Sequence, residues 1–406
     1  MLIGIDGNEA NVEKRVGIGE YAFELLGQFY ETQNSIPDSI GDKSQNHNSK
    51  FKIYLKNKPI SDFPKEQEWW KYSVFGPNRL WTQFVLPLNL YLSRPKPEVF
   101  FSPTHYAPRF SPIPTVISIM DLSYIHFPEL FRKSDLYQLK NWTSYSVKKA
   151  KKILTISEAS KNDIIKMYKA REDKVVVTYP GIKMTSSKLK VQSSKLLKEK
   201  YGIEGDYILF VGTLQPRKNI VRLIEAFSKL SHNYSSSERS ESRSQKDGSR
   251  LRSNNKELQL VIVGKKGWMY EDILKAPKKF GIEDKVRFLD FVSDEDLQLF
   301  YQNALCFVLC SLYEGFGLPV VEAMKYGCPV ITSSVSSLPE AGGEAALYVD
   351  PENVNDIASK INRVLEDNKL REEMIKKGHA QAKKFSWEKT AKETLRVLEE
   401  VAVKNY

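Results

Sequence analysis

Residues 207–219 read Tyr-Ile-Leu-Phe-Val-Gly-Thr-Leu-Gln-Pro-Arg-Lys-Asn. The five apolar residues at the start predict a fully buried strand, and the glycine and proline that follow predict a turn. Two adjacent cations, Arg217 and Lys218, come next, and a helix is expected to begin near Asn219 or Ile220. A buried strand that leads through a turn into a helix is the repeating unit of parallel, doubly wound sheets. This stretch therefore predicts an α/β fold.

Short apolar runs and helix-length amphipathic segments alternate in both directions from this stretch. The alternation predicts two α/β halves, each built on a doubly wound sheet. The expected strands lie near Leu2–Ile5, Lys52–Leu55, Val99–Ser102, Thr115–Ser118, Ile153–Ile156 and Lys174–Val177, and near Tyr207–Gly212, Leu258–Val263, Val286–Phe288, Leu305–Leu309, Pro329–Thr332 and Ala346–Val349. The expected helices lie near Gly19–Phe29, Ser134–Lys148 and Ser160–Met167, and from Ser386 to about Val403.

The chain has 406 residues, which is long for one hydrophobic core, since a domain holds roughly 150. We expect an N-terminal domain over residues 1–182, a Lys/Ser-rich linker over 183–200 and a C-terminal domain over 201–385. Two polar segments, Thr32–Asn48 and Ser235–Asn255, are nearly devoid of large apolar residues, which predicts disordered insertions in loops.

The composition is that of an ordinary globular protein, with 41% hydrophobic and 27% charged residues. No apolar run approaches the roughly 18 to 20 residues of a membrane span, and the first residues lack the pattern of a signal peptide. We therefore expect a cytoplasmic protein. The three cysteines, Cys306, Cys310 and Cys328, lie in apolar segments, which predicts core packing rather than disulfides or a zinc site.

The formal net charge of +11 would suit a nucleic-acid partner or an anionic membrane. The basic runs lack interleaved aromatic residues and match no nucleic-acid module, so we expect no nucleic-acid binding. Peripheral contact with anionic lipid head groups, at the inner face of the membrane, is the form of polyanion binding that the charge favours.

Arg217 and Lys218 stand beside the expected N-terminus of a helix. Backbone N–H groups and the helix dipole attract an anion there, while Arg offers a forked set of donors and Lys a compact charge. The pair therefore suits a pyrophosphate. Cations in such a place are also common in solvated loops, so the pair needs a second feature to support it.

The second feature is residues 312–323, Leu-Tyr-Glu-Gly-Phe-Gly-Leu-Pro-Val-Val-Glu-Ala. They follow an expected strand, carry two glycines for close backbone approach, and begin a helix at Pro319. Glu314 is thus expected on a loop above a strand end, where open α/β sheets bind ligands, and Glu322 one turn into the helix. Carboxylates in these places can accept hydrogen bonds from sugar hydroxyls.

Together these stretches resemble the retaining glycosyltransferases of family 4, whose GT-B fold has two facing Rossmann-like domains. The resemblance spans nearly the whole chain, and its most specific element is the Glu-x7-Glu pattern from Glu314 to Glu322. It implies that Arg217 and Lys218 bind the donor diphosphate, Glu314 contacts the transferred sugar, and Glu322 binds the nucleotide ribose. Gly212 and the backbone amides of Phe316, Gly317 and Leu318 would complete the donor site.

The N-terminal half matches the family less completely. Gly17 and Gly19 resemble its glycine loop, which borders the donor phosphates and the acceptor, and Asp121 is the candidate catalytic carboxylate of this half. Met120 stands where the family has a histidine that often touches the transferred sugar. His105 and His126 lie nearby in sequence and are candidates to compensate.

Three further matches concern the joint between the halves and the donor loop. Residues 179–182 resemble the interdomain hinge, and residues 337–340 resemble the late loop near the donor. Phe385-Ser386-Trp387 resembles the entry to a C-terminal helix, residues 386–406, that packs back on the first domain.

The resemblance implies a hexosyltransferase that moves a hexose, mannose being the best guess, from GDP-mannose or a UDP-sugar to a glycan or lipid-linked acceptor of a cell-envelope polysaccharide. No cofactor or metal is expected, because Arg217, Lys218 and the helix N-terminus would stabilise the leaving diphosphate. No Asp-x-Asp metal motif occupies an equivalent strand end.

Two alternatives remain at this stage. Met120 leaves open a catalytically silent protein that only binds a nucleotide sugar. The pattern Gly17-x-Gly19-x-x-Ala22 formally fits the dinucleotide fingerprint and leaves open an NAD-dependent enzyme. Against the latter, polar residues separate these glycines from the first strand, and the place for a ribose-binding acid falls in a low-complexity insertion.

Overall fold

The computed structural model describes residues 1–15, 17–34, 49–78, 80–183, 193–237 and 258–403. The chain divides into two compact units: unit 1 comprises Met1–Gly181 with Phe385–Tyr406, and unit 2 comprises Ile182–Lys384. Of the two expected insertions, Thr32–Asn34 continues a helix of unit 1 and Ser235–Ser237 a helix of unit 2, so these ends of the predicted loops are wrong. The remaining residues, 35–48 and 238–255, lie outside the described residues.

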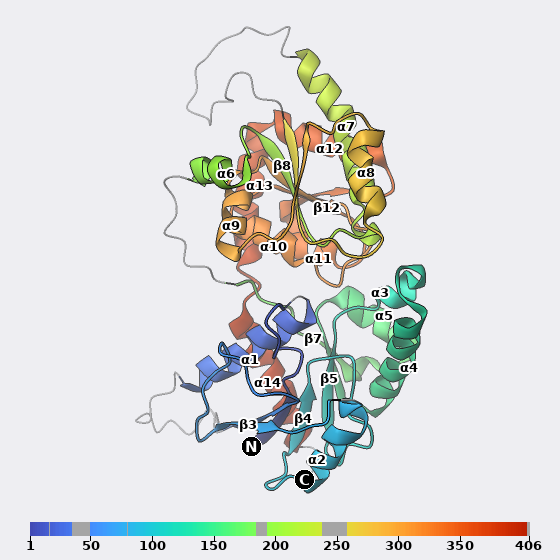
Figure 1. Ribbon diagram of the computed structural model, residues 1–406, viewed down its shortest axis with the longest axis vertical. Coiled ribbons are helices and arrows are strands. Elements are labelled where there is room, and N and C mark those ends of the chain that lie inside the picture. Colours follow the sequence, from blue (N-terminus) through green and yellow to red (C-terminus); the bar gives the residue numbers. More distant parts are fainter. Residues whose placement is uncertain (16, 35–48, 79, 184–192, 238–257, 404–406) are drawn as a thin grey trace. The chain divides into compact units, whose positions relative to one another are not determined.

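Unit 1 contains a seven-stranded parallel sheet in the order β3-β2-β1-β4-β5-β6-β7 (Figure 1). The strands are β1 (Leu2–Asp6), β2 (Lys50–Leu55), β3 (Trp70–Val74), β4 (Val99–Ser102), β5 (Thr115–Ile119), β6 (Lys152–Thr155) and β7 (Val175–Val177). The central strands are buried and rich in Val, Ile and Phe, as expected for a parallel sheet covered on both faces.

Helices cover both faces of this sheet. They are α1 (Ile18–Asn34), α2 (Leu86–Leu92), α3 (Ser123–His126), α4 (Lys133–Lys149), α5 (Glu158–Tyr168) and α14 (Trp387–Val403), with helical turns η1 (Trp81–Val85), η2 (Pro128–Leu130) and η3 (Glu172–Lys174). The last helix, α14, packs against α1, β4 and β6, and its Leu398 and Val401 are buried in one core with Ile3 and Ile5 of β1. The expected return of the C-terminal helix to the first unit is therefore present in the structure.

Unit 2 contains a six-stranded parallel sheet in the order β10-β9-β8-β11-β12-β13. Its strands are β8 (Tyr207–Val211), β9 (Gln259–Val263), β10 (Val286–Leu289), β11 (Cys306–Leu309), β12 (Val330–Ser333) and β13 (Ala346–Val349). Its helices are α6 (Ser193–Tyr201), α7 (Ile220–Ser237), α8 (Glu271–Lys279), α9 (Asp294–Asn303), α10 (Leu318–Lys325), α11 (Leu338–Gly342), α12 (Val354–Glu366) and α13 (Asn368–Ala382), with turns η4 (Pro216–Lys218) and η5 (Gly343–Ala345). The α/β prediction is confirmed, and all three cysteines are buried and free.

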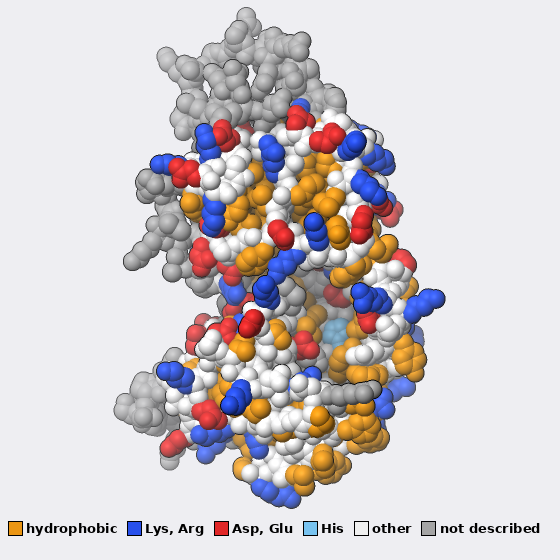
Figure 2. Space-filling model, viewed as in Figure 1, with side chains coloured by type: hydrophobic (Ala, Val, Ile, Leu, Met, Phe, Trp, Pro, Cys, Tyr) orange, Lys and Arg blue, Asp and Glu red, His pale blue; other side chains and the backbone are white. Residues whose placement is uncertain are grey.

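The structure differs from the sequence-based expectation in three elements. Part of the predicted linker 183–200 is helix α6, whose Leu197 is buried and whose Tyr201 ring meets Phe300 of α9 at a centroid distance of 5.1 Å. The edge strand β3 and the helical segment η1–α2 were not expected. Figure 2 shows apolar side chains gathered over α2. Because the exposed face of this helix is apolar as well as the buried one, its sequence lacks the usual amphipathic period.

In each sheet the strand order reverses beside the strand that comes first in the sequence. In unit 1 the reversal lies between β1 and β4, and in unit 2 between β8 and β11. Open α/β sheets bind ligands in the crevice at the carboxyl ends of such a strand pair. The loops that follow these four strands are therefore where a site is expected. Among the described residues, no helix is long and apolar enough to cross a membrane.

Candidate functional site

The loop after β8 places two cations at the strand reversal of unit 2. Gly212 follows the last residue of β8 with a φ of 154°, and Arg217 and Lys218 come next in the turn η4. Asn219 takes a left-handed conformation, with a φ of 60°, and separates this turn from α7, which begins at Ile220. The cations therefore lie just before the N-terminus of α7. This helix begins at Ile220, one of the two residues expected to start it.

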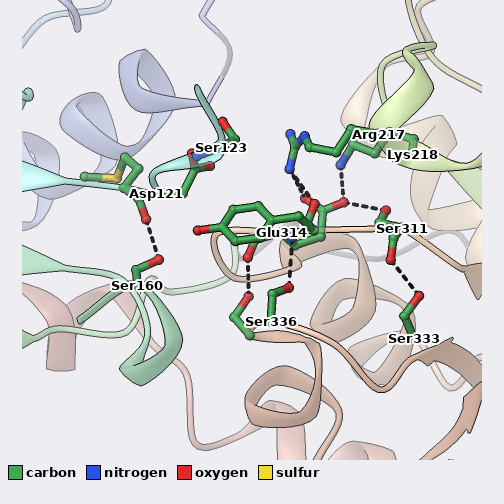
Figure 3. Close-up of polar contacts among 12 residues, drawn as sticks. Asp121, Ser123, Ser160, Arg217, Lys218, Ser311, Glu314, Ser333 and Ser336 are labelled. Atoms are coloured by element: carbon green, nitrogen blue, oxygen red, sulfur yellow. Dashed lines mark hydrogen bonds and ion pairs between the residues drawn. The ribbon is translucent and has the colours of Figure 1, made fainter. Parts of the chain in front are cut away.

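Glu314 follows β11 and lies within reach of both cations. Its Oε1 is 2.5 Å from Lys218 Nζ, and its Oε2 is 3.4 Å from Arg217 Nη1 (Figure 3). The same Arg217 nitrogen also donates to the carbonyl of Tyr313 at 2.6 Å. All three charged side chains are at most 14% exposed. The structure thus joins the two motifs that the sequence separates by nearly a hundred residues.

Serine side chains hold the Glu314 loop in place. Ser311 Oγ donates to Glu314 Oε1 at 2.7 Å, Ser337 Oγ donates to the Glu314 carbonyl at 2.8 Å, and Ser336 Oγ accepts from the Glu314 N–H at 2.9 Å. Ser333 Oγ in turn donates to the Ser311 carbonyl at 2.7 Å. The backbone and side chain of Glu314 are therefore fixed before any ligand arrives, which reduces the cost of ordering them on binding.

The charge of Glu314 follows from these contacts. Burial raises the pKa of its carboxyl, but Lys218 and Arg217 lower it by more, so the pKa of Glu314 lies below its ordinary value. Glu314 is thus a carboxylate at neutral pH. The cluster holds two cations and one anion, which leaves one net positive charge in a nearly buried place and favours an anionic ligand.

The segment after Glu314 forms the N-terminus of α10. Gly317 has a φ of 99°, a conformation that favours glycine, and a Cβ there would also come within 2.7 Å of the Leu338 side chain. Phe316 is buried, and Leu318 begins the helix. The first N–H groups of a helix have no partner inside it. The structure thus places these expected donor-binding residues at a helix N-terminus beside the Glu314 cluster.

Glu322 lies in α10, as expected, and is oriented by one tyrosine. Tyr301 of α9 donates its hydroxyl hydrogen bond to Glu322 Oε2 at 3.1 Å. Burial raises the pKa of Glu322 above its ordinary value, and the Tyr301 hydrogen bond opposes that rise. The second carboxylate oxygen has no hydrogen bond to any side chain in the described part of the chain. Tyr301 was not singled out in the sequence, because its partner lies on another helix.

The loop after β9 packs on the loop after β8 and was also missed. A Cβ on Gly264 would lie 2.0 Å from the carbonyl oxygen of Gly212, and one on Gly267 would lie 2.7 Å from that of Leu214. Backbone hydrogen bonds join the two loops, including Gly267 N–H to the Leu214 carbonyl at 3.0 Å. Two glycines flanking a Lys-Lys pair after an expected strand were the available signal. The loop supports the segment that carries Arg217 and Lys218.

In unit 1 the glycine loop comes immediately before α1. Gly17 has a φ of 53°, and Gly19 lies in the first turn, where a Cβ would come within 2.8 Å of the Glu9 carbonyl oxygen. Because β1 ends at Asp6 and α1 begins at Ile18, these glycines do not form the strand-to-helix turn that a nicotinamide fingerprint requires. The NAD alternative therefore has no structural support.

Asp121 follows β5, and its side chain contacts the first residue of α3. Its Oδ1 accepts the backbone N–H of Ser123 at 2.9 Å. The neighbouring Met120 packs its side chain against the core of unit 1, while its carbonyl accepts from Ser160 Oγ at 3.0 Å (Figure 3). Asp121 thus has a local structural contact, and its catalytic assignment stays a prediction.

The two histidines considered as replacements for the missing one have different surroundings. His126 Nε2 is 2.8 Å from Asp163 Oδ2, so this ring is already paired. His105, in the loop after β4, has a buried Nδ1 that contacts no hydrogen-bond partner among the described residues. Burial lowers the pKa of His105, and nearby Asp121 opposes that shift. Of the two, His105 is the one associated with Asp121.

Asp6 is a buried carboxyl at the end of β1 that sequence reasoning did not select. Its Oδ1 accepts the Asn8 N–H at 3.1 Å and the Asn8 side-chain amide at 2.6 Å. Burial raises the pKa of Asp6 from 3.8 to about 6, although Asn8 and Lys56 oppose the rise. The folded protein therefore keeps this proton at pH values where the unfolded chain has lost it.

Asp6→Asn is expected to remove a pH dependence of stability. The stabilisation from the retained proton is fully present below about pH 4 and is lost as pH rises through about 6. Asparagine keeps an acceptor for Asn8 but carries no charge. Thermal unfolding should therefore match wild type at pH 4 and show a more stable variant at pH 8, by up to roughly 3 kcal/mol. An equal difference at both pH values would contradict the assignment.

Among known proteins, one family match falls within unit 2, and one relative matches along nearly the whole chain. Residues 193–381 match the family described as glycosyl transferases group 1. The O-antigen chain mannosyltransferase B of Escherichia coli is 33% identical, over 97% of this chain and 95% of that protein. The match thus includes both units.

Two solved structures share the fold at low sequence identity. Sucrose-phosphate synthase from Thermosynechococcus elongatus has a TM-score of 0.70 at 15% identity and covers 99% of both chains. Anabaena Alr3699/HepE in complex with UDP and glucose has a TM-score of 0.68 at 18% identity and covers 98% of this chain and 99% of that one. At these identities the likeness concerns the fold alone, and that fold is GT-B.

Proposed function

Because this chain belongs to the group 1 glycosyl transferases, we propose that it transfers a hexose from a nucleoside diphosphate sugar to a glycan or lipid-linked acceptor, with retention of configuration and without a metal ion. The observation that carries the proposal is the buried cluster of Arg217, Lys218 and Glu314 at the strand reversal of unit 2. A net positive cluster beside a helix N-terminus suits a diphosphate, and its carboxylate suits sugar hydroxyls.

Mannose is the proposed sugar, with GDP-mannose the proposed donor and a UDP-sugar the alternative. The relative that matches along nearly the whole chain is named as an O-antigen chain mannosyltransferase, which supports both mannose and a polysaccharide acceptor. The structural neighbour from Anabaena holds UDP and glucose. Thermal-shift comparison of GDP, UDP, ADP and NAD would separate the candidates, because a ligand that binds the native state raises its apparent stability.

In the proposed reaction the bond between the anomeric carbon and the diphosphate oxygen breaks. Arg217 and Lys218 stabilise the charge that develops on the diphosphate, in a place where burial strengthens the interaction. The acceptor hydroxyl attacks the anomeric carbon from the face that the diphosphate leaves and passes its proton to the departing phosphate oxygen. Glu314, fixed by the serines, orients the sugar and stabilises the oxocarbenium-like state.

Unit 1 is assigned the remaining roles. We propose, from the resemblance, that Gly17 and Gly19 border the donor phosphates and the acceptor and that Asp121 is a catalytic carboxylate. One rival function is a protein that binds the nucleotide sugar without transferring it. Met120 supports this rival, because the Met120 side chain packs on the core rather than offering a polar contact. Nucleotide binding without turnover of any sugar donor would favour this rival.

Activity is expected to continue in excess EDTA. Two side-chain cations and the N-terminus of α7 supply the charge stabilisation that a divalent ion gives in other glycosyltransferases. Release of nucleoside diphosphate from GDP-mannose and from a UDP-sugar should be measured with EDTA and with added Mg²⁺ or Mn²⁺. An absolute requirement for either ion would overturn the proposed mechanism.

Glu322→Gln is expected to raise KM for the donor about tenfold with little change in kcat, because a hydrogen bond to a charged acceptor far from the reacting bond contributes similarly to ground state and transition state. Glu366→Gln, which changes an exposed carboxylate of α12 in the same unit, is the matched control. Steady-state kinetics with varied donor give both constants. A loss confined to kcat would contradict a role in nucleotide binding.

A further inference from the structure

A helical segment of unit 1 is anchored by one side only. Turn η1 and helix α2 run without a break from Trp81 to Leu92 and lie on the sheet. Their inward side chains are fully buried and share a core with Tyr54 and Phe100 of the strands; these inward residues are Trp81, Leu86 and Leu90. The inward side chains therefore hold the segment on the sheet, and the outward face is not needed for that packing.

The outward face of this segment is apolar. Leu80 is 52% exposed, Phe84 64%, Leu88 60%, Tyr91 50% and Leu92 67%. Phe84, Leu88, Tyr91 and Leu92 recur at spacings of three and four residues, which puts them on one side of the helical segment, and Leu80 directly precedes it. We call these five residues the α2 apolar face. Exposed apolar residues scattered singly are normal, but a contiguous set on one helix marks an interaction surface. The orange side chains over α2 in Figure 2 show this cluster.

Cations lie near the C-terminal end of the α2 apolar face. Arg94 and Lys96 follow α2 directly, and residues 80–97 contain no Asp or Glu. Arg94 Nη1 donates to the carbonyls of Tyr91 and Ser93, at 3.2 and 2.8 Å, which holds its guanidinium at the end of α2. Lys96 Nζ lies 6.0 Å from the centre of the Tyr91 ring. Cations thus border the same end of the helix that presents Tyr91 and Leu92.

We propose that the α2 apolar face and its flanking cations dock unit 1 on an anionic lipid surface. A helix that lies in a membrane interface inserts apolar and aromatic side chains and sets Lys and Arg against anionic head groups. A second copy of the chain fits less well as the occupant. In a symmetric dimer the same patch meets itself, so the cations of both copies would face each other, and residues 80–97 supply no carboxylate to pair with them.

The docking surface lies on elements that hold none of the donor-binding residues, so it is testable without catalysis. Full-length protein is sedimented with vesicles of phosphatidylcholine alone and of phosphatidylcholine mixed with phosphatidylglycerol, with no donor present. Wild type is expected to bind the mixed vesicles, and less so at high salt, because salt screens the head-group attraction. Failure to bind the mixed vesicles would overturn the proposal and leave the sugar-transfer proposal untouched.

Variants separate the apolar and the charged contributions. Phe84→Ser with Leu88→Ser is expected to weaken binding to mixed vesicles about tenfold or more, and Arg94→Gln with Lys96→Gln to weaken it and reduce its salt dependence. Phe291→Ser is the matched control, since Phe291 is 68% exposed and lies in unit 2. All variants should unfold at the wild-type temperature, because the changed side chains are exposed.

Two results would count against this surface. Unchanged binding of the Phe84→Ser, Leu88→Ser variant would show that lipid binds elsewhere. Light scattering is the second measurement: a wild-type dimer in lipid-free buffer that becomes monomeric in this variant would show that a second copy covers the face instead.

Discussion

Lys218→Met is expected to lower kcat of sugar transfer by about 10²–10³-fold, the usual loss when one preorganised charge-stabilising donor is removed. Lys218 is almost fully buried, and its Nζ is held 2.5 Å from Glu314. Methionine keeps much of the apolar stem but cannot stabilise the charge on the leaving diphosphate. KM for the donor should change less than kcat, because the missing interaction strengthens as the bond breaks.

The control for this prediction is Lys229→Met, which removes an exposed lysine of α7 in the same unit. Thermal unfolding of Lys218→Met should be checked as well, because the variant leaves the buried Glu314 with Arg217 as its remaining cation. A folded variant with kcat within a few-fold of wild type would show that Lys218 serves structure only. In that case Arg217 and the helix N-terminus would have to stabilise the leaving group alone.

Gly181→Ala is expected to destabilise unit 1 by about 3 kcal/mol or more, at the upper end for a small-to-large change. A Cβ at Gly181 would lie 2.1 Å from the backbone nitrogen of Trp387 and 2.6 Å from the carbonyl carbon of Ser386. Backbone cannot rotate away as a side chain can. The junction is tight elsewhere too, since Thr390 Oγ1 donates to the Tyr179 carbonyl at 2.6 Å.

Tryptophan fluorescence suits the measurement, because Trp268 is in unit 2 and the other five of the six tryptophans are in unit 1. For a unit of about 200 residues the expected loss corresponds to a fall of roughly 6–12 °C in Tm. Gly27→Ala is the control: Gly27 lies within α1, a Cβ there meets nothing within 4 Å, and alanine favours a helix. Equal Tm values for the two variants would contradict the close approach at Gly181.

Much of this architecture could be predicted from sequence, because buried parallel strands are continuous apolar runs bounded by turns. The runs at Tyr207–Val211 and Cys306–Leu309 are such strands. Their order in the sheet decides that the residues after them meet at one edge. Arg217 and Glu314 could therefore be selected separately by motif, but their direct ion pair needed the structure.

The elements that were missed depend on tertiary contacts. Helix α6 has a polar, lysine-rich sequence, and it becomes part of the fold through Leu197 and Tyr201, which pack against neighbouring elements. The serines around Glu314 are ordinary turn residues in sequence, and only the chain path brings Ser336 and Ser337 to its backbone. Such contacts leave no periodic pattern to read.

Unit 1 is assembled from two distant parts of the chain, and this affects how the protein is made. Residues 182–384 are continuous and precede α14 in the chain, so most of unit 2 leaves the ribosome before α14 does. The apolar surface of β1 and β4 that α14 covers stays uncovered while unit 2 is synthesised. Until α14 emerges, that apolar surface is open to chaperones and to aggregation.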